Sequence, residues 1–181
     1  MRTKFLLVAL ASVVSGCTPQ QKTNFPAAPT EKPGSDGFFV KKFPDGSASV
    51  SRSQNVLDKS WSIDCRVDQM NDKRDCSITS KTGGPFIYYG NASNPQSVCI
   101  LGHDFPGRTG QIRIDKGSPV STDNEGCVRA SSILPQMRTG KTFLSRWVKW
   151  PYDYSRDDSY DLDGLNKAME VVAEIQNGKV Q

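Results

Sequence analysis

The sequence is poor in the residues on which many enzymes and metal sites depend. It has one histidine, His103, and its five cysteines include no C-x-x-C pair, which argues against a zinc site built from Cys and His. Neither a Walker-type phosphate loop nor a G-x-S-x-G nucleophile motif is present. We therefore expect no metal, no cofactor and no catalytic residue of these kinds.

Long apolar runs are also missing. The longest, Phe5–Val14, is too short to cross a bilayer, which takes about 20 residues, but it has the length of a signal-peptide core and follows Arg2 and Lys4. The segment that ends this run, Val14-Ser15-Gly16-Cys17, resembles the bacterial lipobox. We expect residues 1–16 to be a lipoprotein signal peptide, removed before Cys17. The alternative is an ordinary secretory signal followed by an incidental cysteine.

Processing at Cys17 would leave that residue lipidated, with a diacylglyceride and usually a third acyl chain such as palmitate. Several acyl chains hold a protein to a membrane without spanning it, and far more firmly than one chain. Thr18, rather than Asp, follows the cysteine, which by resemblance to the sorting rule of enteric bacteria favours the outer membrane of a Gram-negative source. We expect a cell-envelope protein facing the periplasm or the cell surface.

Excess positive charge is absent from the part expected to fold. The net charge of +4 comes from Arg2, Lys4 and residues 17–60, which hold six Lys or Arg against four Asp or Glu, whereas residues 61–181 hold fifteen of each. Nucleic-acid binding usually needs a clustered basic face, so we expect no nucleic-acid partner.

The composition divides the mature chain in two. Residues 17–60 are expected to form the lipidated cysteine and a flexible tether, because 18–36 is rich in Pro, Lys, Thr and Gln and cannot bury a core. Within this part we expect one hairpin, over 38–53, turning at Pro44-Asp45-Gly46. The folded domain is expected over 61–181.

Alternating apolar and polar residues predict short strands in this domain. Trp61, Ile63, Cys65 and Val67 alternate with polar residues, as in a half-buried strand. Further β-rich runs occur at 76–80, 85–89, 97–101, 111–115, from 126 onward, and at 142–150, the longest. The predicted fold is mainly β, an antiparallel β-sandwich or barrel-like domain with a C-terminal α-helix.

Helical spacing is confined to two places near the end. In 163–178, apolar residues fall on one helical face, with Asp163 as the expected cap and Gly178 just past the end. Residues 131–138 are expected to form a short helical turn with Leu134 and Met137 inward.

Four cysteines remain once Cys17 carries lipid, an even number for an oxidising compartment: Cys65, Cys76, Cys99 and Cys127. Three connectivities are open. We favour the pairing of near neighbours, Cys65–Cys76 and Cys99–Cys127, in which closing the shorter loop would contribute about 3 kcal/mol.

The order of short motifs along 61–175 resembles the invasion-associated locus B family of envelope proteins. The motifs are Trp61-x-x-x-Cys65, Cys76-x-Ile78, a strand with Ile112, Ile114 and Asp115, Gly126-Cys127, Arg138-x-Gly140-Lys141, and Asp161-Leu162-x-Gly164-Leu165-x-x-Ala168. The resemblance implies an exported β-sandwich domain without an assigned activity or cofactor, in a family with some members tied to entry into host cells.

Two features depart from the pattern of that family. Ser121–Asn124 stands where the family places a cysteine before the Gly-Cys motif, so the resemblance implies that Cys99 takes over as the partner of Cys127. The lipobox and the long tether are additions to the commoner soluble form.

A cysteine enzyme is the alternative hypothesis. Gly126–Arg129 resembles the nucleophile segment of L,D-transpeptidases, with Cys127 as nucleophile, His103 as base and Arg129 positioning the substrate. Against it, Glu125 occupies the place of the motif's histidine, where its charge would oppose thiolate formation. The spacing from His103 to Cys127 is also too long, and an odd number of cysteines would be left to pair.

Aromatic residues cluster between 147 and 154. Trp150, Tyr152 and Tyr154 are the candidate binding surface, whereas Trp147 is expected to pack in the core. The acidic run Asp153–Asp163 lacks EF-hand spacing and is expected to be a solvated loop, and His103 is expected to be a solvated loop histidine. We expect a lipid-anchored binding or structural module, held to the membrane by its anchor, whose partner is an envelope protein, peptidoglycan or a host surface.

Overall fold

The computed structural model of the chain describes residues 32–54 and 60–178. These residues belong to one compact unit, Glu31–Gln181. The predictions for the signal peptide, for lipidated Cys17 and for the tether up to residue 31 lie outside the described residues. Among the described helices, none is long and apolar enough to cross a membrane.

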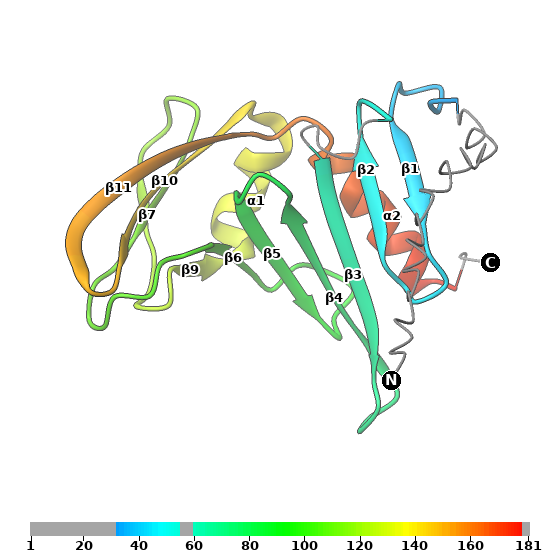
Figure 1. Cartoon of the computed structure of the whole chain (residues 1–181), viewed down its shortest axis with the longest axis horizontal. Helices are drawn as coiled ribbons and strands as arrows, with labels where there is room; N and C mark the ends of the chain where they lie inside the picture. Colours follow the sequence, from blue (N-terminus) through cyan, green and yellow to red (C-terminus); the bar gives the residue numbers. More distant parts are fainter. Residues whose placement is uncertain (1–31, 55–59, 179–181) are drawn as a thin grey trace, which may run out of the picture. The chain divides into compact units, whose positions relative to one another are not determined.

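Seven antiparallel strands form the larger sheet (Figure 1). Across the sheet they are β1 (Phe39–Lys42), β2 (Ala48–Ser51), β3 (Ser60–Asp68), β4 (Lys73–Ser80), β5 (Pro85–Gly90), β6 (Ser97–Ile100) and β9 (Cys127–Arg129). All but the last step join strands that follow one another in the chain, which makes this sheet a meander.

Four antiparallel strands form the smaller sheet, in the order β11 (Tyr152–Asp161), β10 (Thr142–Lys149), β7 (Gln111–Ile114) and β8 (Val120–Ser121). Two helices complete the unit, α1 (Ala130–Thr139) beside β6 and β9, and α2 (Leu165–Gln176) against β2, β3 and β4 (Figure 1). The predicted fold class is confirmed: the protein is mainly β, with two antiparallel sheets and a C-terminal helix.

One hydrophobic core joins the sheets and the helices. In β3 the predicted alternation holds for Trp61, Ile63 and Cys65, which are buried while their neighbours are more exposed. It is wrong for Val67, which is 50% exposed near the end of the strand. The apolar stripe of α2 faces the same core, with Leu165 and Val172 buried. The short helix is also confirmed, although Ile133 and Met137 are its large buried residues and Leu134 is only half-buried.

The hairpin predicted over 38–53 is present and belongs to the folded unit rather than to the tether. Its second strand, β2, pairs with β3 along Ser60–Ile63, so the folded unit includes residues that the sequence assigned to the tether before 61. Gly46 makes this contact close: its carbonyl oxygen accepts a hydrogen bond from the Cys65 amide, and a Cβ on Gly46 would lie 2.3 Å from the Cys65 carbonyl oxygen.

Three sequence predictions near the C-terminus are wrong. The acidic run Asp153–Asp163 is not a loop, because most of it forms β11. The run at 142–150 is not the longest strand, because it forms β10 with eight residues and β11 has ten. Asp163 does not cap α2: the cap position is Gly164, in the left-handed conformation with φ 83°, and no side chain caps the helix. The Asp163 carboxylate instead accepts hydrogen bonds from Arg52.

Candidate binding surface

The β10–β11 hairpin carries the three aromatic side chains that the sequence singled out, Trp150 in its turn and Tyr152 and Tyr154 at the start of β11. The side chains of Trp150, Tyr152 and Tyr154 are 58%, 53% and 53% exposed. Trp147, three residues before Trp150 in β10, is half-buried against the core, as predicted. Rings of this size are usually covered in a folded protein, so their joint exposure makes them a candidate interaction surface.

Neighbouring side chains hold these rings. The Arg156 guanidinium lies 5.2 Å from the ring centroid of Tyr154 and 5.4 Å from that of Trp147, and it donates a hydrogen bond to the Tyr154 hydroxyl at 2.7 Å. The Trp147 indole Nε1 donates to the Asp158 carboxylate at 2.5 Å. These contacts hold Trp147 and Tyr154 in place, whereas Trp150 and Tyr152 are more than half exposed.

A loop distant in sequence, 101–110, adds a fourth ring to the surface. Phe105 meets Trp150 edge to face, with 5.2 Å between the ring centroids. Arg108 lies over Phe105 and forms an ion pair with Asp153. We call the surface made by Phe105, Trp150, Tyr152, Tyr154, Arg108 and Arg156 the aromatic tip. Sequence analysis missed Phe105 and Arg108, because only the tertiary fold brings this loop to the hairpin.

His103 fastens this loop to β10, and the prediction of a solvated histidine is wrong. It is 7% exposed. Its Nδ1 accepts a hydrogen bond from the Val148 amide at 3.2 Å, which leaves the proton on Nε2, 3.0 Å from the Arg108 carbonyl oxygen. Next to it, the Asp104 carboxylate accepts from the Trp150 amide at 2.7 Å. These hydrogen bonds hold the 101–110 loop against the end of β10 and against the backbone of Trp150.

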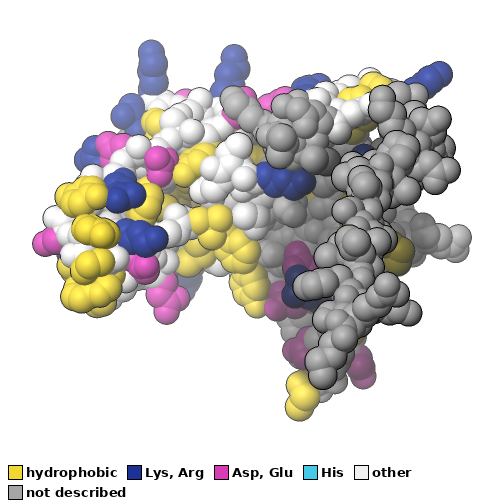
Figure 2. Space-filling model, viewed as in Figure 1, with side chains coloured by type: hydrophobic (Ala, Val, Ile, Leu, Met, Phe, Trp, Pro, Cys, Tyr) yellow, Lys and Arg dark blue, Asp and Glu magenta, His cyan; other side chains and the backbone are white. Residues whose placement is uncertain are grey.

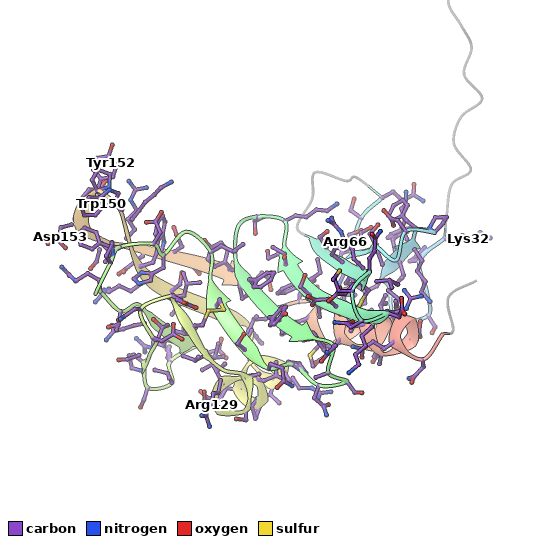
Figure 3. The ribbon with its side chains drawn as sticks, turned by 90° about the horizontal axis from the view of Figure 1, so that it is seen from below. Lys32, Arg66, Arg129, Trp150, Tyr152 and Asp153 are labelled. Atoms are coloured by element: carbon purple, nitrogen blue, oxygen red, sulfur yellow. A yellow bond between two sulfur atoms is a disulfide. The ribbon has the colours of Figure 1, made fainter. Side chains whose placement is uncertain are left out.

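The aromatic tip forms one end of the folded unit. Figure 2 shows apolar side chains interleaved with Lys, Arg, Asp and Glu side chains over this end. In Figure 3, Trp150, Tyr152 and Asp153 lie at one extremity and Lys32, the first described residue, lies at the other. The surface is therefore remote from the point at which the N-terminal segment joins the folded unit.

Both favoured disulfides are present. Cys65–Cys76 and Cys99–Cys127 each join residues that face one another across adjacent antiparallel strands. The first pair is fully buried in the core and the second is half-buried.

The residues of the transpeptidase hypothesis are partly brought together. A Cβ on Gly126 would lie 2.9 Å from the His103 side chain, so the imidazole packs on the backbone next to Cys127. However, the Cys127 sulfur is bonded to Cys99, and both nitrogens of His103 are engaged in hydrogen bonds. Arg129 is exposed, at a distance from the labelled tip residues (Figure 3). In this oxidised form Cys127 offers no thiolate.

A groove of about 520 Å³ lies between the ends of β2, β3 and β11, away from the aromatic tip. Arg52 stacks 3.9 Å over the Phe38 ring and holds the pKa of Asp163 below its usual 3.8 through two hydrogen bonds. Burial, with a smaller contribution from Asp158, raises the pKa of Tyr160 to about 12. The Arg52–Asp163 charges compensate each other, so we assign this groove a structural role at the junction of β11 and α2.

The residues described include no group of three or more His, Cys, Asp or Glu side chains arranged to hold a metal ion. Fold and surface together define a disulfide-stabilised protein of two antiparallel sheets with an exposed aromatic tip. Comparison of the chain with family models, with curated proteins and with solved structures found no match.

Proposed function

We propose that the protein is a lipid-anchored binding module of the cell envelope and that the aromatic tip is its contact surface. The observation that carries the proposal is the joint exposure of Trp150, Tyr152 and Tyr154 on a hairpin that hydrogen bonds hold against the 101–110 loop. The anchor is Cys17, acylated after removal of residues 1–16.

The composition of the tip supports a role in binding. Trp, Tyr and Arg are the residues that contribute most to the affinity of protein interfaces. Trp and Tyr do so because they bury a large area for little loss of side-chain freedom. Here Phe105 against Trp150 and Arg156 against Tyr154 already restrict the side chains before a partner arrives. Such preorganisation lowers the entropic cost of association.

The partner is another component of the envelope or its surroundings: an envelope protein, peptidoglycan or a host surface. The last of these follows from the resemblance to the invasion-associated locus B family. An L,D-transpeptidase-like activity of Cys127 remains the alternative, and titration of free thiols in the oxidised protein separates the two. The binding module has none, whereas the enzyme needs a reactive Cys127.

Site-specific photo-cross-linking tests the binding surface in intact cells. A photoreactive amino acid at Tyr152 is expected to give a discrete adduct. The matched control is the same substitution at Met70, which is 93% exposed at the turn between β3 and β4 and has no role in the proposal. Equal adducts at the two positions, or none at either, would mean that the tip is not a specific contact surface.

The anchor has an independent test. Cys17→Ser is expected to abolish labelling by a fatty-acid analogue and to release the protein from membranes. A variant that fractionates like the unsubstituted protein would disprove acylation of Cys17.

A further inference from the structure

We infer that Arg113 binds a carboxylate in a small groove on the smaller sheet, at a second site that goes beyond the proposed function of the aromatic tip. The groove has a volume of about 210 Å³ and lies over β7, β10 and β11, which are neighbours in that sheet (Figure 1). The structural basis is the half-buried Arg113 side chain, which lines the groove and forms no ion pair within the described part of the chain.

The first support is the environment of the Arg113 guanidinium. Its Nε atom is buried and has no hydrogen-bond partner among the residues that the structure describes. A buried charged donor without a partner is costly, and folded proteins usually satisfy such a group with an acceptor from the protein, from water or from a ligand. The guanidinium is thus partly withdrawn from water without a counter-charge, which strengthens its attraction for an anion in the groove.

The second support is that the two aspartates lining the groove are engaged elsewhere. The Asp157 carboxylate accepts two hydrogen bonds from Arg146, at 2.7 and 2.6 Å, and these bonds hold the pKa of Asp157 below its usual 3.8. The Asp158 carboxylate accepts from the Trp147 indole, which packs against the core. Because successive residues of a strand point to opposite faces of a sheet, Asp158 lies on the other face from Asp157. Neither aspartate pairs with Arg113.

A third carboxylate, that of Asp115, lies two residues after Arg113 and is also engaged. It accepts hydrogen bonds from the backbone amides of Lys141 at 3.1 Å and Thr142 at 2.8 Å. These bonds direct Asp115 to the start of β10 rather than to the guanidinium of Arg113. The charge of Arg113 therefore remains to be matched by a ligand.

The lining of the groove favours a carboxylate over other anions. Gln111 is on the same face of β7 as Arg113, two residues earlier, so its side-chain amide is a further donor. Leu144 stands opposite Arg113 in the register of β7 and β10, and Pro119 adds a second apolar wall. A planar guanidinium, a neutral donor and apolar walls match a carboxylate attached to a small apolar group.

The volume limits the ligand to a small one. Sites for drug-sized molecules usually measure about 300–1,000 Å³, whereas this groove has about 210 Å³. It therefore has room for a small carboxylic acid or for the carboxyl-terminal residue of a peptide, which present the same chemistry. Phosphate at neutral pH carries more negative charge than Arg113 alone can balance, and it gains nothing from the apolar walls.

NMR titration of the Arg113 side chain tests the inference. The protein is the chain from residue 17 onward carrying Cys17→Ser, which has no acyl groups. The probes are acetate, N-acetyl-trialanine, the C-terminal amide of the same peptide, and phosphate, compared at equal ionic strength. Acetate and N-acetyl-trialanine are expected to shift the Nε–Hε signal of Arg113 until it saturates, whereas the amide and phosphate leave it in place. Tighter binding of the peptide than of acetate identifies a peptide terminus as the source, and equal binding identifies a small free acid.

Two variants separate recognition from a structural role. Arg113→Gln removes the charge and is expected to weaken acetate binding about tenfold or more, followed through the backbone amide signals of β7. Arg129→Gln removes an exposed arginine of β9 and is the matched control, with unchanged acetate binding. Thermal unfolding of Arg113→Gln should show no loss of stability, because the substitution removes a buried donor that has no partner.

The outcomes that would overturn the inference are distinct from those that bear on the aromatic tip. They are the absence of a saturable shift with acetate and with N-acetyl-trialanine, equal acetate binding by Arg113→Gln, and tighter binding of phosphate than of acetate. A marked loss of thermal stability in Arg113→Gln would assign Arg113 to the fold instead. Cross-linking at Tyr152 is measured separately, so failure at Arg113 leaves the proposed function of the tip intact.

Discussion

Two long hairpins of this protein have similar strand lengths and opposite surroundings. The β3–β4 hairpin has a neighbouring strand on each side, is covered by α2, and is joined by the buried Cys65–Cys76 disulfide. The β10–β11 hairpin is covered on one side only, because β11 is an edge strand with every residue at least partly exposed. It is held by side-chain contacts and by the loop that His103 fastens.

The two hairpins therefore differ in how much they contribute to stability and in how much surface they leave exposed. A strand enclosed by neighbours and a helix contributes most to the core, and its substitution is costly. An edge strand with exposed rings contributes less to the core, and its exposed surface is available for contact with a partner. Substitutions in the enclosed hairpin should therefore cost more stability than substitutions in or beside the open one.

Ile78→Ala in β4 should have the largest effect. Ile78 is fully buried in the center of the larger sheet, and truncation of such a side chain leaves a cavity that costs about 2–5 kcal/mol. Chemical denaturation measures the loss. Val67→Ala in the same hairpin, where the side chain is 50% exposed, is the control and should cost far less. Equal losses would show that the hairpin is not enclosed as described.

Removal of the cysteine pairs should come next. The Cys65–Cys76 bond closes 11 residues and Cys99–Cys127 closes 28, so the chain-entropy model gives about 3 and about 3.5 kcal/mol for the two Cys→Ala double variants. Because the Cys65–Cys76 pair is fully buried, its removal also leaves a cavity, so the losses of stability in the two double variants should be similar. Midpoints of denaturation that do not move would mean that the bonds are not formed in the purified protein.

His103→Ala should have a smaller effect that is confined to the second hairpin. It leaves the buried Val148 amide without its acceptor, which costs about 1–3 kcal/mol. It also frees the loop that carries Phe105, so cross-linking at the tip should weaken as well. Hydrogen exchange should rise at Val148 and not in β3 or β4. Unchanged exchange at Val148 would contradict the role given to His103.

Asp163→Asn should have the smallest effect. Hydrogen bonds from Arg52 lower the pKa of Asp163 from 3.8, so the folded state favours the charged form. The resulting stability is fully present above about pH 4 and is lost as the pH falls through the lower value in the folded protein. Solvent screens this exposed pair, so the gain is slight. Stability of the variant should therefore depend less steeply on pH below about 4, and an identical acid slope would contradict the assignment.

Sequence patterns predicted the enclosed hairpin far better than the open one. In β3, one face is buried and the other is not, so Trp61, Ile63 and Cys65 alternate with polar residues in the sequence itself. In β11 neither face is fully buried, and four aspartates make the strand read as a loop. Charge on an edge strand guards against pairing with other chains, and that same charge conceals the strand from pattern analysis.

For a related reason, only some residues of the aromatic tip could be predicted from the sequence. Trp150, Tyr152 and Tyr154 are close in sequence, so their clustering is visible without a fold. Phe105 and His103 reach the same place through tertiary contacts, and nothing local distinguishes a buried histidine from a solvated one. The Cys65–Cys76 pairing was predictable because consecutive strands of a meander face each other, whereas Cys99–Cys127 joins β6 to β9, which are adjacent in the sheet but not consecutive in the chain.

The placement of the two sulfur bridges makes oxidation a reporter of strand alignment. Cys65 stands opposite Cys76, and Cys99 stands opposite Cys127. A slip of either strand pair by two residues would carry the sulfurs about 7 Å apart along the sheet, beyond bonding reach. Only chains whose strands have met in this alignment can close both bridges. Peptide mapping of the linked cysteines would thus count correctly aligned molecules in a preparation.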